Sequence, residues 1–398
     1  MSTGSNTFDH GLLSPGTAGG DGIVSDPAIA LALIQVEDAY LRALVATGIA
    51  PQTVGTLESI GLRDLDSLAR DARETGNPMV PLLAQLRPQL DPETAKWLHK
   101  GATSQDIVDS ALMVTALRAR AMILTQLGAT IASLASLADE HRGTVAAART
   151  LTQHSTPTTW GLRFATWLGT VLDARDALAA VTLPAQLGGA SGTLAALVEL
   201  AGAQRAAQVP AAFAEQLGLA ASAPWHTSRA PVTRLGDALA GVTDALGVIA
   251  ANVATQSRTE IAELAEPTQE GRGGSSAMPQ KHNPVLSILI RGNALRAPGL
   301  VGTLHLCAAN AVDERPDGAW QAEWPTLREL MRLAIGSANL AAELTAGLSV
   351  NTEAVAKNLA LDDILAEQRA IAGASTTPAG YLGLNAELID AAIARARA

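Results

Sequence analysis

The sequence is poor in cysteine and in aromatic residues. A single cysteine, Cys307, occurs among 398 residues, so an internal disulfide is excluded and the core must be stable without one. Phe, Trp and Tyr together make up 3% of the chain, so alanine and leucine must fill the core, and such small side chains let helices pack closely. Low cysteine usage is typical of a reducing compartment, and we predict a cytoplasmic protein.

Two further features are missing, an excess of basic charge and an uninterrupted apolar segment. Lys and Arg number 28 against 38 Asp and Glu, a net charge of -10, and no basic stripe with interleaved aromatics occurs, which argues against a nucleic-acid partner. The N-terminus lacks a basic segment followed by an apolar run, and nowhere do we find the ~18 apolar residues of a membrane span. We therefore expect no membrane partner. An anionic substrate would need a few placed cations and helix N-termini.

Long stretches without proline predict long helices. Such runs extend over 158–183 and 232–266, and residues 106–141 repeat apolar side chains mostly at three, four, five or seven positions, as a buried helical face does. We predict an all-α, long-helix protein in three parts. Residues 1–100 form a small helical N-terminal domain, 101–350 a central long-helix bundle, and 351–398 a small helical C-terminal domain.

Three polar islands interrupt the helical pattern, and the first is "HKGATSQD", residues 99–106. Thr103 and Ser104 directly precede a long predicted helix, with Asp106 in its first turn. This arrangement fits an ordinary helix cap. It equally fits a cradle for a carboxylate, because a helix N-terminus offers unpaired N–H groups.

The second island is "RTLTQHSTPTTWG", residues 149–161. His154 stands three residues before a proline that we expect to open the next helix. A lone histidine is often a satisfied structural group, because its hydrogen bonds are easily met near a helix start. Gln153 and Arg149 beside it strengthen the case for a binding site.

The third island, "EGRGGSSAMPQKHNPV", covers residues 270–285. Its glycines allow the backbone to approach a ligand closely, or they mark a flexible exposed loop. A flexible loop does not explain the prolines on either side of Lys281 and Asn283, which order the chain there. We interpret this segment as a lid over an anion.

Together the islands resemble a known superfamily. "GGSSAMPQKHNP" matches the GSSxMPxKxNP signature of the fumarase/aspartase superfamily, and "GATSQD", "QHSTP" and "GGASGT" resemble its other islands in the same chain order. Within it, "TQHSTPTTWG", "QLGGASGTLAAL", "APWHTSR" and "ERPDGAWQAEWPTL" look most like the prokaryotic-type 3-carboxy-cis,cis-muconate cycloisomerases. The resemblance begins near Gly20 and implies a C-terminal domain that is shortened after Asn358. Asp313 departs from the pattern, since similar sequences carry histidine there.

The resemblance also implies residue roles. Ser275 is implied to transfer the proton, and Lys281 and Asn283 to hold the carboxylate that takes up the charge. We expect His154 mainly to orient or neutralise a carboxylate, because a carboxylate with a pKa near 4 adds or leaves without a proton, so one proton-transfer residue suffices. The remaining matched positions are expected to bind substrate: His99, Thr103, Ser104, Gln153, Arg229 and Arg315.

The implied activity is conversion of 3-carboxy-cis,cis-muconate to 4-carboxymuconolactone, in the protocatechuate branch of aromatic catabolism, through an aci-carboxylate intermediate. The resemblance implies a polycarboxylate substrate and a homotetramer with shared active sites. We find no motif for a metal or a nucleotide cofactor and expect neither. Two alternatives remain: an argininosuccinate- or adenylosuccinate-type lyase of the same superfamily, and a non-catalytic structural homologue.

Overall fold

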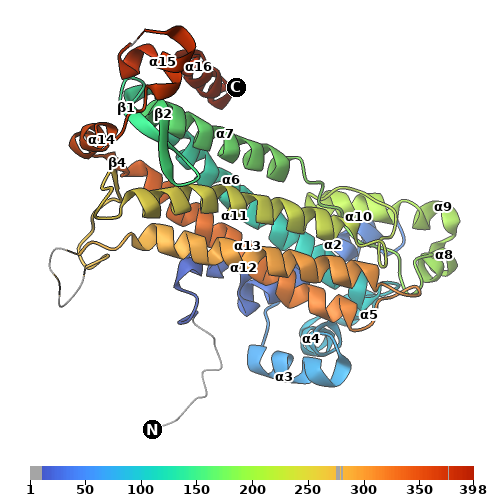
Figure 1. Cartoon of the computed structure of the whole chain (residues 1–398). Helices are drawn as coiled ribbons and strands as arrows, with labels where there is room; N and C mark the ends of the chain where they lie inside the picture. Colours follow the sequence, from blue (N-terminus) through green and yellow to red (C-terminus); the bar gives the residue numbers. More distant parts are fainter. Residues whose placement is uncertain (1–10, 275–277, 279–280, 375) are drawn as a thin grey trace. The chain divides into compact units, whose positions relative to one another are not determined.

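The structure, a computed structural model, describes residues 11–274, 278, 281–374 and 376–398. Helices dominate, which confirms the predicted all-α class (Figure 1). The chain divides into two compact units: the first contains the chain up to Ala121, Ala180–Leu239 and Pro298–Arg332, and the second the remainder. Four long helices contribute residues to both units: α6 (Ser104–Glu140), α11 (Ala230–Gln256), α12 (Val285–Ala309) and α13 (Ala319–Ala346). The three linear domains remain a prediction.

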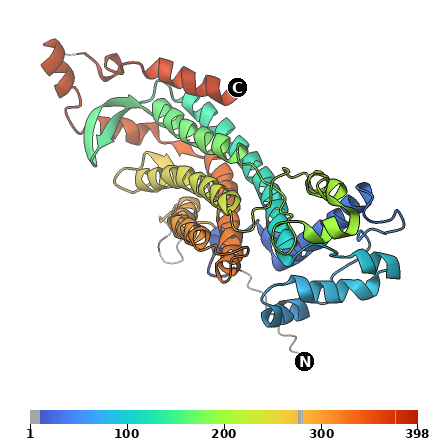
Figure 2. The same cartoon turned by 90° about the vertical axis from the view of Figure 1, so that its right-hand side faces the viewer.

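The first unit is organised around α2 (Asp26–Ala46), which packs against α10 (Val209–Leu217). Tyr40 and Phe213 meet edge to face at 5.8 Å between ring centroids, and both are fully buried. The pairing of the blue α2 with the yellow-green α10 can be followed from a second side (Figure 2). The shorter helices of this unit are α1 (Asp21–Val24), α3 (Leu65–Thr75), α4 (Met79–Leu86), α5 (Pro92–Trp97), α8 (Ala195–Ala201) and α9 (Ala203–Ala206), with 3-10 turns at Pro15–Thr17 and Arg87–Gln89.

The second unit is organised around α7 (Trp160–Ala179), which packs against α16 (Asn385–Arg397). Trp160, Phe164 and Trp167 lie on one face of α7. Trp167 meets the other two rings edge to face, Trp160 and Phe164 are tilted to each other, and the ring centroids are 5.3–6.3 Å apart. Three of the chain's eleven Phe, Trp and Tyr residues are thus buried in this one cluster. The other elements are β1 (Val145–Thr150), β2 (Gln153–Thr159), β3 (Leu264–Ala265), β4 (Ser349–Val350), α14 (Thr352–Leu359), α15 (Ala366–Ala372) and a 3-10 turn at Pro378–Gly380.

The β1–β2 hairpin is a feature that the sequence patterns did not predict. The two strands are antiparallel, and Leu151 and Thr152 turn the chain with φ of 49° and 72°, the left-handed pair that a tight two-residue hairpin requires. Pro157 pairs with Ala147 beside a register shift, where a strand tolerates a residue without an N–H. The expectation that this proline opens a helix was therefore wrong, because the helix begins at Trp160.

The predicted long helices are present, but one is shorter than its proline-free run. α11 ends at Gln256, well before Glu266, and the chain then turns into β3, which pairs with β4. By length and composition alone, α6 and α11 could cross a membrane, with 33% and 56% of their most apolar windows buried. Core helices of soluble proteins pass the same test, so this finding is weak evidence for a membrane.

Candidate active site

In the first unit, the start of α6 has the geometry of a helix cap. The Thr103 N–H donates to the carboxylate of Asp106 at 2.9 Å, and the Asp106 N–H donates to the Thr103 carbonyl at 3.0 Å. This reciprocal bonding satisfies backbone groups that a helix start leaves unpaired. Ser104 is the first helical residue and is half-buried. The cap interpretation of this island fits the geometry, and both hydroxyls lie at the N-terminus of the longest helix.

Asp106 joins three stretches that are far apart in the sequence. Its carboxylate is fully buried and accepts hydrogen bonds from the N–H groups of Gly188 (2.9 Å) and Gly189 (3.0 Å). Nε2 of His226 lies 2.8 Å from the same carboxylate. One side chain thereby fixes the "GATSQD", "GGASGT" and "APWHTSR" motifs against each other. The sequence marks Asp106 only as a first-turn residue, because its partners in the other two motifs lie 82 to 120 positions away.

Arg315 lies beside the cap and presents a cation there. Its guanidinium donates to Oγ1 of Thr103 at 2.5 Å and to the carbonyl of Ala190 at 2.9 Å. The side chain is half-buried, so part of it is accessible to solvent. A guanidinium next to a helix N-terminus is a favourable place for a carboxylate. The structure thus brings Thr103, Ser104 and Arg315 together at the start of α6.

Arg229 occupies different surroundings. Arg229 is 2% exposed. Its guanidinium forms ion pairs with Asp109 (2.7 Å) and Glu323 (2.6 Å) and lies over the ring of Trp225. Burial lowers the pKa of Arg229, but the charges of both carboxylates outweigh burial and raise it overall. Asp109 also accepts from Nε1 of Trp320. The donors of Arg229 are therefore used to hold α6 and α13 to the start of α11, and the predicted contact with substrate has no support in this geometry.

His99 is held by a carboxylate from α2. Its Nδ1 lies 2.6 Å from Oε1 of Glu37, whose side chain is 0% exposed, while the His99 side chain is 15% exposed. Burial lowers the pKa of His99, but the hydrogen bond and charge of Glu37, together with the charge of Asp106, leave it raised above the ordinary value. The imidazole consequently favours the charged form that a substrate carboxylate would attract.

In the second unit, Gln153 and His154 lie at the start of β2, next to the hairpin turn. Gln153 is exposed, and His154 pairs in register with Arg149 of β1. Nδ1 of His154 lies 2.6 Å from Oδ2 of Asp362, which is close enough for an ion pair, although the ring N–H is not aligned for a hydrogen bond. The structure thus places a carboxylate beside the histidine that the sequence indicated.

Glu263 organises the polar side of this hairpin. Its carboxylate is fully buried and accepts from Arg149 (2.5 Å), from Nε1 of Trp160 (3.2 Å) and from Nδ2 of Asn358 (2.9 Å). Arg163 approaches the same carboxylate at 3.4 Å, and burial lowers the pKa of that guanidinium. The ion pair with Glu263 gives Arg149 a structural role beside His154. Its charge stabilises Glu263 and is not free for a ligand.

The signature loop is fastened to itself by Asn283. Both the backbone N–H and the Nδ2 of Asn283 donate to the carbonyl of Gly273, at 2.9 and 3.1 Å. Gly273 has φ of 69°, and an added Cβ would lie 2.6 Å from the Asn283 carbonyl, so only glycine fits there. Lys281 is exposed. Ser275, the residue expected to transfer the proton, lies outside the described residues.

A cavity of about 220 Å³ adjoins this loop. Its polar lining comes from Ser257, Glu266, Thr268, Arg272, His282 and Asn283. The Glu266 carboxylate accepts from the N–H groups of Leu286 (3.0 Å) and Ser287 (2.8 Å), which are the first free donors of α12. An acidic side chain therefore occupies the N-terminus of α12, so a bound anion would depend on Lys281 and on loop amides.

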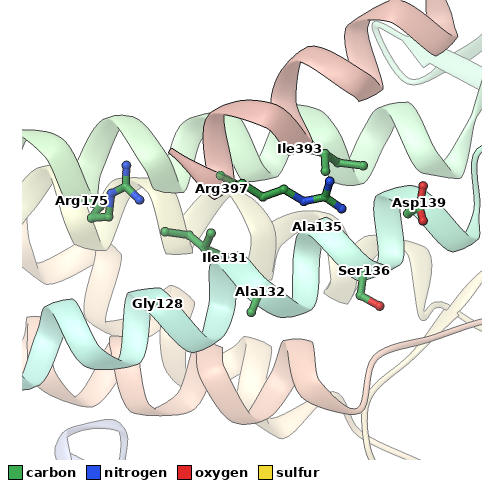
Figure 3. A pocket seen from close by; sticks show the side chains of 10 residues that line it. Gly128, Ile131, Ala132, Ala135, Ser136, Asp139, Arg175, Ile393 and Arg397 are labelled. Atoms are coloured by element: carbon green, nitrogen blue, oxygen red, sulfur yellow. The ribbon is translucent and has the colours of Figure 1, made fainter.

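A larger cavity, of about 520 Å³, lies between α6, α7 and α16 in the same unit (Figure 3). Arg175 and Arg397 extend over it from α7 and α16, and small residues of α6 form its floor (Figure 3). It contains none of the residues that the sequence singled out. Size alone therefore does not mark the catalytic position in this chain.

The long helices and the GSSxMPxKxNP sequence together define a lyase of the fumarase/aspartase type. The chain belongs to the lyase family of the fumarase/aspartase superfamily: the family model described as "Lyase" matches residues 64–299. It is an enzyme of that superfamily, and it is similar to members with different named activities.

Three similarities bear on specificity. The chain is 44% identical over 368 residues to the nitrosuccinate lyase of Streptomyces davaonensis, which covers 89% of this chain and 77% of the relative. It is 40% identical over 363 residues to the 3-carboxy-cis,cis-muconate cycloisomerase of Pseudomonas aeruginosa, which covers 88% and 78%. The crystal structure of the 3-carboxy-cis,cis-muconate lactonizing enzyme from Pseudomonas putida superposes with a TM-score of 0.86 at 30% identity, over 95% of this chain and 96% of that one.

Proposed function

We propose that the enzyme adds or eliminates a weakly basic anion at the carbon β to a carboxylate of a small polycarboxylate. The similarity to both a cycloisomerase and a nitrosuccinate lyase over almost nine-tenths of the chain carries this proposal. In lactonisation the adding group is a carboxylate oxygen, and in elimination from nitrosuccinate the leaving group is nitrite. Both groups are ionised near neutral pH, so neither needs a general acid. A single proton-transfer residue then serves both reactions.

In the proposed mechanism Ser275 carries that proton. During lactonisation a carboxylate oxygen attacks the β carbon, the electron pair moves into the neighbouring carboxylate, and the serine delivers a proton to the α carbon. Elimination runs in the opposite sense: the serine removes the α proton and the anion leaves from the β carbon. Lys281 and Asn283 would stabilise the aci-carboxylate through fixed donors in a closed site.

The remaining carboxylates of the substrate need their own partners. Thr103, Ser104 and Arg315 at the start of α6 provide hydroxyls, a cation and a helix N-terminus at one place. We assign His154 to orient a carboxylate, with Asp362 beside its Nδ1. Gln153, which is exposed on the same strand, supplies a further donor.

The first candidate substrate is 3-carboxy-cis,cis-muconate, with 4-carboxymuconolactone as product, because relatives at 34–40% identity and a solved structure over 95% of the chain carry that activity in their names. The second candidate is nitrosuccinate, because the relative with that name is more similar in sequence, at 44%. Asp313 departs from the cycloisomerase pattern and so weakens the case for the first candidate. Its exposed backbone has φ of 53°.

We also propose that the enzyme is a homotetramer in the cytoplasm. α12 exposes Ile288 (51%), Leu295 (80%) and Leu306 (67%), which recur at seven and eleven positions along one face. Only a third of the most apolar window of α6 is buried within one chain. Exposed apolar helix faces of this extent are typical of surfaces that pack against further copies of the chain. Packing in a tetramer would bury them and keep the protein soluble.

Two assays in parallel test the substrate. The first follows the ultraviolet absorbance of 3-carboxy-cis,cis-muconate, because lactonisation removes the conjugated diene. The second measures nitrite released from nitrosuccinate. Ser275→Ala serves as the control in both. Turnover of one substrate by the wild type alone identifies it. If neither is turned over, argininosuccinate and adenylosuccinate are tested next, and an inert tetramer would contradict the proposal in favour of a structural role.

A further inference from the structure

Glu37 is a buried carboxylate with an unusual environment. Its side chain is 0% exposed, Oε1 lies 2.6 Å from Nδ1 of His99, and Oε2 has no hydrogen-bond partner among the described residues. A buried carboxylate with only one hydrogen-bonded oxygen destabilises the folded state unless a nearby cation offsets its charge. Glu37 has no role in the proposed mechanism, but it contacts His99, which is expected to bind substrate.

The chain around His99 is held at two points by α2. His99 has φ of 62°, a left-handed conformation that is uncommon for a residue with a side chain. The hydroxyl of Tyr40 donates to the carbonyl of Lys100 at 2.8 Å. Glu37 and Tyr40 are three positions apart and therefore share one face of α2. That face fixes both the ring and the backbone of the turn that precedes the substrate-binding start of α6.

We propose that Glu37 is a positioning residue for His99. Its carboxylate accepts the Nδ1–H of the imidazolium and fixes the ring, so that the Nε2–H of the charged ring is the donor that a substrate carboxylate meets. The inference rests on the proposed function, in which His99 binds a carboxylate. Among the described residues, Glu37 is the one hydrogen-bond partner of the ring, and the side chain keeps 15% of its surface exposed. The other charged groups that act on the ring are Asp106 of α6 and Arg87 of the 3-10 turn after α4.

The first experiment needs no turnover and no variant of Glu37. Nitrogen NMR of the full-length enzyme with labelled histidine distinguishes protonated from bare ring nitrogens, and His99→Gln assigns the signals. We expect His99 to remain an imidazolium to higher pH than an exposed histidine, and then to keep its proton on Nδ1. A neutral ring that keeps the proton on Nε2 would overturn the proposal.

The second experiment measures binding of tricarballylate, a saturated tricarboxylate that cannot react, by calorimetry near neutral pH. In Glu37→Gln the ring loses its counter-charge, and we expect about a tenfold loss of affinity, as for one charge-assisted hydrogen bond. The matched control is Asp38→Asn on the same helix, which removes a buried carboxylate that pairs with Arg42 and not with a histidine. A merely structural role would weaken binding equally in both variants.

The outcomes separate the two proposals. If neither candidate substrate is turned over, the NMR and tricarballylate results still decide the role of Glu37. If Glu37→Gln lowers the pKa of His99 but binds tricarballylate as tightly as the wild type, the positioning role is wrong. If the variant does not fold, the proton position in the wild-type ring remains the deciding measurement.

Discussion

Arg229 and Arg315 both belong to motifs that resemble those of the prokaryotic-type cycloisomerases, but their side chains meet different surroundings. The guanidinium of Arg229 is enclosed between Asp109 and Glu323, whereas that of Arg315 reaches one hydroxyl and one carbonyl and stays partly accessible. Removing a buried cation from between two buried anions destabilises the fold, because both carboxylates lose their counter-charge. An accessible cation beside a helix start instead acts on a ligand.

These surroundings predict opposite phenotypes for the same substitution. Arg229→Met should lower the free energy of unfolding by about 3–5 kcal/mol, because it leaves two buried charges unpaired. Arg315→Met should change that free energy by less than about 1 kcal/mol and should raise KM with little change in kcat. Urea denaturation and steady-state kinetics check both. A stable Arg229→Met enzyme with a raised KM would show that this arginine meets substrate.

The proton-transfer assignment predicts unequal losses at two residues. Ser275→Ala should reduce kcat by about 1,000-fold or more while tricarballylate still binds, because the variant lacks the group that moves the proton. His154→Gln should retain part of kcat and mainly raise KM. Ser276→Ala is the matched control and should keep most activity. The assignment fails if His154→Gln is as inactive as Ser275→Ala with binding intact.

The raised pKa of His99 predicts a pH dependence of stability. A histidine whose pKa is higher in the folded state stabilises the fold fully below its unfolded-state pKa, about 6.5, and this contribution is lost as pH rises through the folded-state value. The stability difference between wild type and Glu37→Gln should therefore shrink as pH rises from about 6 towards 9. Denaturant unfolding across this range measures it, and Asp38→Asn should keep the wild-type slope.

Among the elements, the signature loop depends on one close approach of backbone to backbone. Gly273→Ala places a Cβ 2.6 Å from the Asn283 carbonyl at a φ of 69°, whereas an added Cβ at Gly274 meets nothing within 4 Å. We expect Gly273→Ala to reduce kcat by about 10- to 100-fold while the helices stay intact, since the strained loop costs about 1–3 kcal/mol. Gly274→Ala should be nearly neutral. Equal activity of both variants, measured alongside circular dichroism, would refute this.

The element scale also shows what sequence patterns convey. Apolar spacing and proline-free runs were enough to predict the long helices, because helix periodicity is local. The β1–β2 hairpin was not predicted, because "QHSTPTT" has no alternation of apolar and polar residues. Its turn also uses Leu151 and Thr152 in place of glycine or asparagine. The motifs identified the neighbourhood of Thr103, His154 and Lys281, but they did not indicate the partners of the buried carboxylates Glu37, Asp106 and Glu263. The partners of those carboxylates are often more than 60 positions away, and no local pattern records such distances.

At the scale of the whole molecule, the exposed face of α12 predicts assembly. Leu295 is 80% exposed in the middle of this helix, and in a tetramer it would be buried against another copy. Leu295→Glu should therefore convert the tetramer to smaller species and reduce activity if sites are shared between copies. Sedimentation velocity measures the assembly. Ile371→Glu, on α15 and 75% exposed, is the control and should leave the tetramer unchanged.

The acidic residue at the start of α12 has a consequence for redesign. Glu266 already neutralises the positive end of that helix with its own carboxylate, so the loop that precedes α12 does not attract anions indiscriminately. Recognition of a substrate anion next to this loop would then depend on the loop's own side chains, which can be substituted one at a time. A library aimed at new substrates can thus vary Gln280 and His282, the variable positions of the signature on either side of Lys281, while Glu266 keeps the helix capped.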